Sequence, residues 1–296
     1  MKMTIKLRRT LRFGLSAFLA LFISGLLAQP FQGQATSVHS SAEHRLLLPP
    51  QIISGERATL AVLDTSGRLA PGVTVHFSNG DRVTTDKTGR ALFVAPLDQK
   101  EISASIVGSN RRAKAAILSA AAASADAPVV STAPKFVAAG DRFELRGKGF
   151  CGDADANQVL ITGKRALVLA SSPLALTITP PPEVAPGRAT LQLTCTKNVS
   201  APFIITFLEL DLRADSSPLK PGEHRPISVH IKGTTGRVPI EATNLSPNIA
   251  EMVGGNSVIS KSSGGSENIA RVVLIGKARG TFRVAIRVVP TILRRH

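Results

Sequence analysis

The side chains that could carry out chemistry are few in this 296-residue chain, and none stands in a recognised catalytic motif. Beyond residue 35 there is no Gly-x-Ser-x-Gly, no His-Glu-x-x-His and no complete phosphate-binding loop. The Gly163-Lys164 pair lacks both the earlier glycine and the following Ser or Thr of that loop. We therefore predict no catalytic residue, no cofactor and no metal, in a protein that is not an enzyme.

Histidines and one acidic cluster were the remaining candidates for a site. A hydrolase triad needs a histidine that is held by an acid and faces a nucleophile, and the sequence shows no such partner for His224 or His230. The spacing of Asp153, Asp155 and Asn157 resembles the start of a calcium loop. That pattern then fails, because Gln158 replaces the glycine and Lys164 the bidentate glutamate that such a loop requires. We interpret all of these residues as surface residues; the six histidines are His39, His44, His76, His224, His230 and His296.

Residues 1–35 have the layout of a secretory signal peptide. Residues 1–12 are basic, residues 13–28 are apolar and uncharged, and small residues follow. The apolar run is shorter than the ~20 residues that span a bilayer, and no later segment is long and apolar enough to do so. Ala28 and Ala35 are both acceptable cleavage points. We expect a bacterial protein that is secreted, periplasmic or displayed at the cell surface.

Export would place Cys151 and Cys195 in an oxidising compartment, where an even pair within one domain is usually bonded. Both lie at the ends of predicted strands, which a sandwich can bring within the Cα separation of about 4.4–6.8 Å that a disulfide needs. Two cysteines without a nearby histidine or further cysteine make a poor zinc site, and neither belongs to a Cys-x-x-Cys motif. We predict a structural disulfide; a buried pair of free thiols and a metal site are the alternatives.

From about residue 45 onward the sequence has the pattern of strands. Short runs rich in Val, Ile, Leu and Thr alternate with turn residues at intervals of about 8–12 residues, which predicts an all-β sandwich or barrel architecture. Residues 119–127 are rich in Ala but have no apolar face, so they are expected to form a linker. The predicted units are 45–118, 128–205 and 206–292, of about the size of small domains.

In the first unit two turns stand out. Asn79-Gly80 predicts a hairpin turn, since both of its central positions would need positive φ. The run Thr85-Asp86-Lys87-Thr88-Gly89-Arg90-Ala91 precedes a strand and resembles the turn that bacterial immunoglobulin-like domains often carry there. The resemblance implies an immunoglobulin-like sandwich over residues 45–118.

The second unit carries the more specific motifs. It has Gly147-Lys148-Gly149-Phe150 after its second strand, a later Asn157-x-Val159 strand and a Pro186-Gly187 turn. Together these resemble an IPT/TIG domain, which implies an immunoglobulin-like fold over 128–205. The two glycines would allow a bulge or a tight bend, and Phe150 would then close the end of the sandwich.

The third unit ends in what looks like the final hairpin of a bacterial immunoglobulin-like domain, turning at 276–280. With that turn, Phe282, Val284 and Ile286 would face Leu274, Val272 and Ala270 in the core. Arg271, Arg283 and Arg287 would then share one exposed face, which is a candidate anion-binding face; a solvated face that opposes aggregation is the alternative. Residues 260–266 are expected to form a mobile loop.

Composition sets the last limits on function. The net charge of +16 includes five basic residues within 1–35, so +11 remains beyond them, and no block of five like charges suggests a nucleic-acid arm. The chain has no Trp and no Tyr, on which sugar rings usually stack. We expect tandem immunoglobulin-like β-sandwiches with a non-enzymatic binding, adhesion or envelope-scaffold role, and an unknown protein or an anionic polysaccharide as partner. An accessory carbohydrate-binding module and a divergent secreted hydrolase are the alternatives.

Overall fold

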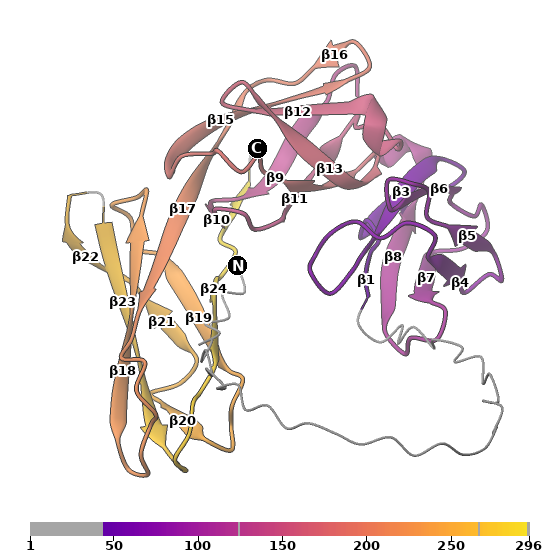
Figure 1. Ribbon diagram of the computed structural model, residues 1–296. Coiled ribbons are helices and arrows are strands. Elements are labelled where there is room, and N and C mark those ends of the chain that lie inside the picture. The colour runs from indigo at the N-terminus through magenta and orange to yellow at the C-terminus, as the bar shows by residue number, and fades with distance from the viewer. Residues whose placement is uncertain (1–43, 124, 266, 295–296) are drawn as a thin grey trace, which may run out of the picture.

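A computed structural model describes residues 44–123, 125–265 and 267–294 of the chain. The signal peptide expected over residues 1–35 lies outside this part. The described chain is an all-β fold of immunoglobulin-like sandwiches, as predicted, with three separate hydrophobic cores. Figure 1 shows the three sandwiches arranged as an arch, with the second at the top. Within the described residues, no helix has the length and hydropathy of a membrane span.

The first sandwich packs two layers around one core. One layer contains β1 (Arg45–Leu47), β3 (Arg57–Leu63) and β6 (Arg90–Val94); the other contains, in spatial order, β2 (Gln51–Ile53), β8 (Arg112–Leu118), β7 (Glu101–Ile106), β4 (Thr74–Phe77) and β5 (Arg82–Thr84). Because side chains alternate along a strand, Val75 and Phe77 of β4 are buried while Thr74 and His76 face outward. Strand β3 is buried on both faces, since its outer face meets the second sandwich.

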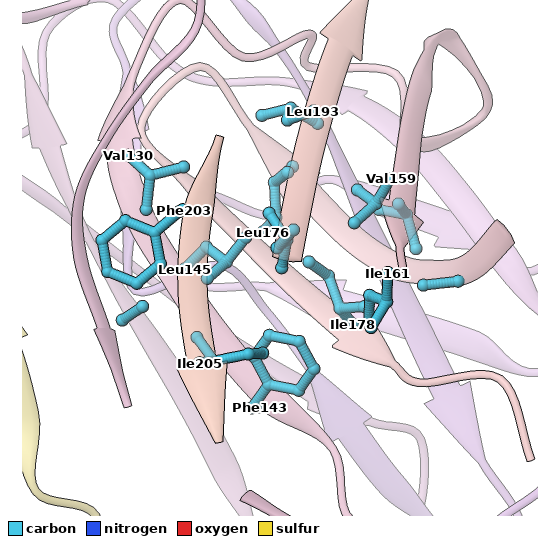
Figure 2. Close-up of a cluster of buried hydrophobic side chains, with 14 of the residues drawn as sticks. Val130, Phe143, Leu145, Val159, Ile161, Leu176, Ile178, Leu193, Phe203 and Ile205 are labelled. Atoms are coloured by element: carbon cyan, nitrogen blue, oxygen red, sulfur yellow. The ribbon is translucent and has the colours of Figure 1, made fainter. Parts of the chain in front are cut away.

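The second sandwich contains the largest of the three cores. One layer contains β9 (Val129–Pro134), β11 (Phe143–Lys148), β14 (Ala175–Thr179) and β13 (Lys164–Ser172); the other contains β12 (Asn157–Ile161), β15 (Gly187–Cys195), β16 (Asn198–Val199), β17 (Phe203–Arg213) and β10 (Phe136–Ala138). Strand β13 serves both layers, because its first residues pair with β12 and its later residues with β14. Figure 2 shows the buried side chains of the two layers facing one another, among them Phe143, Leu145, Ile161 and Leu193.

The third sandwich shares β17 with the second. The C-terminal half of β17 pairs with β18 (His224–Lys232), which pairs with β23 (Glu267–Gly276); β20 (Ala250–Val253) and β22 (Lys261–Gly264) both pair with the far side of β23. The opposing layer contains β21 (Ser257–Ile259), β19 (Pro239–Asn244) and β24 (Val284–Val288). The last strand, β25 (Ile292–Arg294), returns to the second sandwich and pairs with β9.

The predicted turn at Asn79-Gly80 forms, although its geometry differs from the prediction. Gly80 has φ 94° but Asn79 does not have positive φ, and the hydrogen bonds Gly80 N to Phe77 O and Phe77 N to Asp81 O close a three-residue loop. The turn is therefore a three-residue hairpin loop with glycine at its left-handed position, and the expected pair of positive φ angles was wrong.

The glycine motif of the second sandwich does what its sequence predicted. The pairing of β11 with β9 shifts at Gly147, which is a β-bulge, and a Cβ on Gly147 would lie 1.8 Å from Val129 O. Gly149 has φ 69°, and the Phe150 side chain is buried in the core. The two glycines are required because the backbone approaches β9 closely and then turns into a left-handed conformation.

Two expected loops are more ordered than the sequence suggested. Ala120–Ala122, within the predicted linker, form a 3-10 turn. Residues 261–264, predicted to be mobile, form strand β22 on the far side of β23, while residue 266 lies outside the described part. Ser and Gly are poor strand formers, but main-chain hydrogen bonds to a neighbouring strand can fix them at an edge regardless of their side chains.

Candidate functional site

The predicted disulfide is present. Cys151 and Cys195 are bonded, with their Cα atoms 5.5 Å apart and a sequence separation of 44, and no free cysteine exists. Cys195 ends β15 directly opposite Asn157 of β12. Asn157 is buried, and its side chain accepts a hydrogen bond from Cys151 N and donates to Cys151 O. The disulfide therefore closes a loop that the buried side chain of Asn157 also holds through its hydrogen bonds to Cys151.

The acidic residues of that loop have a structural role. The Asp153 side chain accepts a hydrogen bond from Asp155 N at the start of a short 3-10 turn, Ala154–Ala156. Asp155 forms an ion pair with Arg90 of the first sandwich, with 2.7 Å between Oδ1 and the guanidinium. Among the described residues no group of three or more metal-ligating side chains comes together.

This ion pair belongs to a junction between the first and second sandwiches. Thr59 Oγ1 donates to Gly152 O at 2.9 Å and accepts from Ala154 N at 3.0 Å. Arg90, which is only 8% exposed, also donates to Val168 O. Around these bonds lie buried apolar side chains that belong to none of the three cores: Ile53, Ala61, Leu63, Leu169, Leu174 and Ala175.

The junction between the second and third sandwiches is built from the main chain. Strand β17 places Phe207 in the second core and Leu208 in the third. Phe136 and Ala138 of β10 also pack in the third core, although the sequence placed them in the second unit. Strand β25 closes the junction through its pairing with β9. The three sandwiches are therefore held together without a flexible linker between the last two.

The structure gives His230 an acidic partner that the sequence did not reveal. His230 Nδ1 lies 3.1 Å from Glu267 Oε1, across the pair of strands β18 and β23. The residues directly opposite His230 in register are Asp211 and Ile269, and neither carries a hydroxyl group. His224 is at the start of β18, and His39 and His296 lie outside the described residues.

The three arginines of the predicted anion-binding face do not come together as expected. Arg271 is exposed on β23, whose partners are β18, β20 and β22. Arg287 lies on β24, which pairs with β19 in the opposing layer and places Arg287 in an ion pair with Glu241. Arg283 is exposed just before β24. The predicted hairpin between these two strands was therefore wrong, and with it the shared face.

The physical reason lies in the connection over residues 276–280. Its backbone bonds to distant segments, through Gly276 N to Glu223 O, Lys277 N to Ile249 O and Gly280 N to Leu219 O. These bonds direct the chain across to the other layer instead of back along β23. The inward-facing residues were still predicted correctly, because alternation along each strand does not depend on which strand is its partner. Ala270, Val272, Leu274 and Ile286 are buried, and Phe282 and Val284 pack against the same core.

A different basic face forms on the outer side of the first sandwich. Register places Arg82 of β5 opposite His76 of β4, His76 opposite Ser105 of β7, and Ser105 opposite Arg112 of β8. We call these four residues the basic row. Arg82 and Arg112 are exposed and, among the described residues, neither forms an ion pair. Glu101, an exposed acid of β7, is paired with Lys114 of β8.

One end of the basic row borders a hollow with a volume of about 420 Å³. His76 and Arg82 line it together with His44, Thr74 and three aliphatic side chains. The His44 Nδ1 atom is buried, and no described residue forms a hydrogen bond with it. A buried polar atom without a partner is unusual and calls for a specific explanation.

Sequence reasoning missed this face, although part of its signal was present. The Asn79-Gly80 turn and the alternation of 73–77 together bring His76 opposite Arg82. Ser105 and Arg112 could not have been added from sequence, because β7 joins β4 only through a pairing between segments that are far apart in the chain.

Comparison with known proteins gives likeness in fold alone. No family model and no curated protein matches the chain. A Bacteroides ovatus glucan-utilisation protein, SGBP-B, aligns with a TM-score of 0.34 and 11% identity over 88% of this chain and 76% of that one. The Escherichia coli adhesin FdeC aligns with a TM-score of 0.23 and 16% identity over 86% and 97% of the two chains. The surface-layer protein SbsC aligns with a TM-score of 0.21 and 13% identity, and this chain spans 39% of its length. With TM-scores below 0.5, these likenesses carry no argument about function.

Proposed function

We propose that this chain is a non-enzymatic protein of the bacterial cell envelope or exterior, which acts as a rigid binding or scaffold element. The observation that carries the proposal is the pair of built junctions, which fix three immunoglobulin-like sandwiches in one arrangement. A fixed arrangement suits a protein that presents binding surfaces at a set distance and angle, since rigidity lowers the entropic cost of engaging a partner.

The disulfide supports the proposed compartment. Structural disulfides persist in oxidising surroundings and are rare in the reduced cytosol of ordinary bacteria. A bonded Cys151–Cys195 pair therefore favours export, in keeping with the signal peptide proposed over residues 1–35. Cleavage after Ala28 or Ala35 belongs to the same proposal.

The domain assignment is also a proposal. The units are 45–118 and 206–292, both of the bacterial immunoglobulin-like kind, and 128–205 of the IPT/TIG kind. Residues 119–127 link the unit 45–118 to the unit 128–205. The three cores support this division, and the bulge at Gly147 supports the IPT/TIG motif. The boundary at 205/206 falls within β17, so the last two units would not be separable by cutting there.

The test is retention on purified envelopes. The full chain, produced with its own export segment and recovered from the extracytoplasmic fraction, should be retained on isolated cell envelopes of the producing bacterium. It should show no free thiol after denaturation without reductant. Absence of retention, together with turnover of ester, peptide or glycan substrates, would overturn the proposal in favour of a hydrolase.

A further inference from the structure

The first sandwich carries the basic row on its outer face. The basic row crosses four neighbouring strands, β5, β4, β7 and β8, which are labelled in Figure 1. Strands in a sheet are about 4.8 Å apart, so Arg82 and Arg112 at the ends of the row are separated by roughly 14 Å. Between them lie the imidazole of His76 and the small hydroxyl of Ser105, which project less far from the sheet than the two arginines do.

The hollow at the Arg82 end adds a second, independent observation. There His44, His76, Arg82 and Thr74 line one concave space, so imidazole, guanidinium and hydroxyl groups all contribute to its wall. An oxyanion in the hollow would accept hydrogen bonds from imidazole, hydroxyl and guanidinium groups, and the bonds from guanidinium would be charge-assisted.

We propose that the basic row and its hollow bind an acidic polysaccharide, laid across the strands with one oxyanion in the hollow and another at Arg112. The inference rests on the proposed function and adds to it the site and the chemical class of the ligand. Carboxylate, sulfate or phosphate groups on the glycan would all satisfy the same donors. The glycan hydroxyls between these groups would meet Ser105 and Thr74.

The geometry favours a glycan over an acidic peptide or a nucleic acid. An extended peptide gains affinity by adding main-chain hydrogen bonds along a sheet edge, whereas this row runs across the strands and meets an edge only at Arg82 of β5. Single-stranded nucleic acid is bound by stacking its bases on aromatic side chains. No aromatic side chain other than His76 belongs to the row, because Phe77 points into the core.

The test compares two variants with the same change of charge. Arg82→Gln with Arg112→Gln removes two exposed arginines from the basic row, and Arg271→Gln with Arg283→Gln removes two from the third sandwich. Binding of the full exported chain to immobilised dextran sulfate, polygalacturonate and neutral dextran is measured, with unchanged thermal unfolding as the criterion that each variant is folded.

We expect the wild-type chain to bind at least one acidic glycan and not neutral dextran, more weakly as salt is raised. The row variant should bind roughly tenfold more weakly, while the control variant should change by less than about threefold. His44→Asn should also weaken binding, because it removes an imidazole that lines the hollow. The glycan that binds more tightly identifies sulfate or carboxylate as the preferred oxyanion.

Several outcomes would overturn the inference. Equal losses in the two arginine variants would mean that diffuse charge, and not this face, holds the glycan. Tighter binding of polyglutamate or single-stranded DNA than of either glycan would reject the ligand class. If the row variant is still retained on envelopes like the wild type, the inference falls and the proposed function stands. If the wild type is not retained on envelopes and binds no acidic glycan, both fall.

Discussion

The two junctions of this molecule hold neighbouring sandwiches together by different kinds of contact. The first sandwich is held to the second by buried apolar side chains, side-chain hydrogen bonds, one ion pair and a single backbone pairing between Thr59 and Ser171. The second is held to the third by a continuous strand, a parallel strand and a returning C-terminal strand. The first junction therefore depends on the identity of a few residues, whereas the second depends mainly on the backbone.

The difference indicates at which junction the arrangement of the sandwiches can change. Side-chain contacts can be removed one at a time, and each typically contributes only about 1 kcal/mol or a little more. A strand that belongs to two sandwiches cannot bend away from one without breaking pairing in both. We therefore expect substitutions at the first junction to alter the angle between sandwiches, and substitutions at the second to alter folding stability.

The largest effect should come from the disulfide, which anchors the loop of the first junction. Replacing Cys151 and Cys195 by Ala should lower the free energy of unfolding by up to about 4 kcal/mol, because the bond closes a long loop. Chemical denaturation of the variant should match that of the reduced wild-type chain. An unchanged denaturation midpoint would show that the loop is held by Asn157 alone.

Gly233→Ala should disrupt the second junction and lower the folding stability of the protein. Gly233 has φ +105°, and an added Cβ would lie 2.4 Å from Phe207 O and 2.8 Å from Gly187 N. We expect a loss of roughly 1–3 kcal/mol from backbone strain, with the clash adding to it, measured as a lower thermal midpoint. A stability equal to that of the wild type would mean that this junction is not tightly packed.

Gly152→Ala is the matched change at the first junction. Its Cβ would lie 1.9 Å from Arg57 O on the neighbouring sandwich, but Gly152 does not have positive φ, so its own backbone tolerates alanine. The clash can be relieved by moving the first sandwich away. We expect a larger radius of gyration in small-angle scattering with a smaller loss of stability than Gly233→Ala. An unchanged scattering profile with strong destabilisation would reverse the comparison.

Arg90→Gln should have a smaller effect on the same junction. It removes the ion pair to Asp155 and a hydrogen bond to Val168 O, and an unsatisfied buried acceptor costs about 1–3 kcal/mol. Asp155→Asn should cost less than about 1 kcal/mol, since the Asp155 side chain is 72% exposed and exposed ion pairs contribute little. Denaturation of both variants separates the two contributions; equal losses would assign the effect to the ion pair.

The smallest expected effect is on the stability of the protein at acidic pH. The Thr88 hydroxyl, followed by backbone N–H groups and the Arg90 charge, lowers the pKa of Asp86 below its ordinary value of 3.8, against a smaller opposing effect of burial. Since the folded-state pKa is the lower one, this contribution to stability is present above about pH 3.8 and is lost as pH falls through the folded value. Asp86→Asn should therefore flatten the decline of stability below pH 4 in acid titrations. An identical pH dependence in the variant would exclude this carboxylate.

Much of the candidate site was within reach of the sequence, and one decisive part was not. Alternation identified Val75 and Phe77 as core and so placed His76 on the outer face, and the hairpin turn brought Arg82 opposite it. Nothing local could bring Ser105 and Arg112 beside them, or His44 to the hollow. These contacts depend on pairings between segments that are distant in the chain.

By itself the sequence determined the all-β class, the position of the Asn79-Gly80 turn, the inward-facing side chains and the disulfide. These depend on local sterics, on the two-residue repeat of a strand and on having only two cysteines. Only the tertiary structure decided which strand pairs with which. It separated Arg271 from Arg287, joined Arg90 to Asp155 and assembled the basic row. The reason is that a strand exposes the same main-chain donors and acceptors to every partner, so distant packing contacts select among pairings that look equivalent locally.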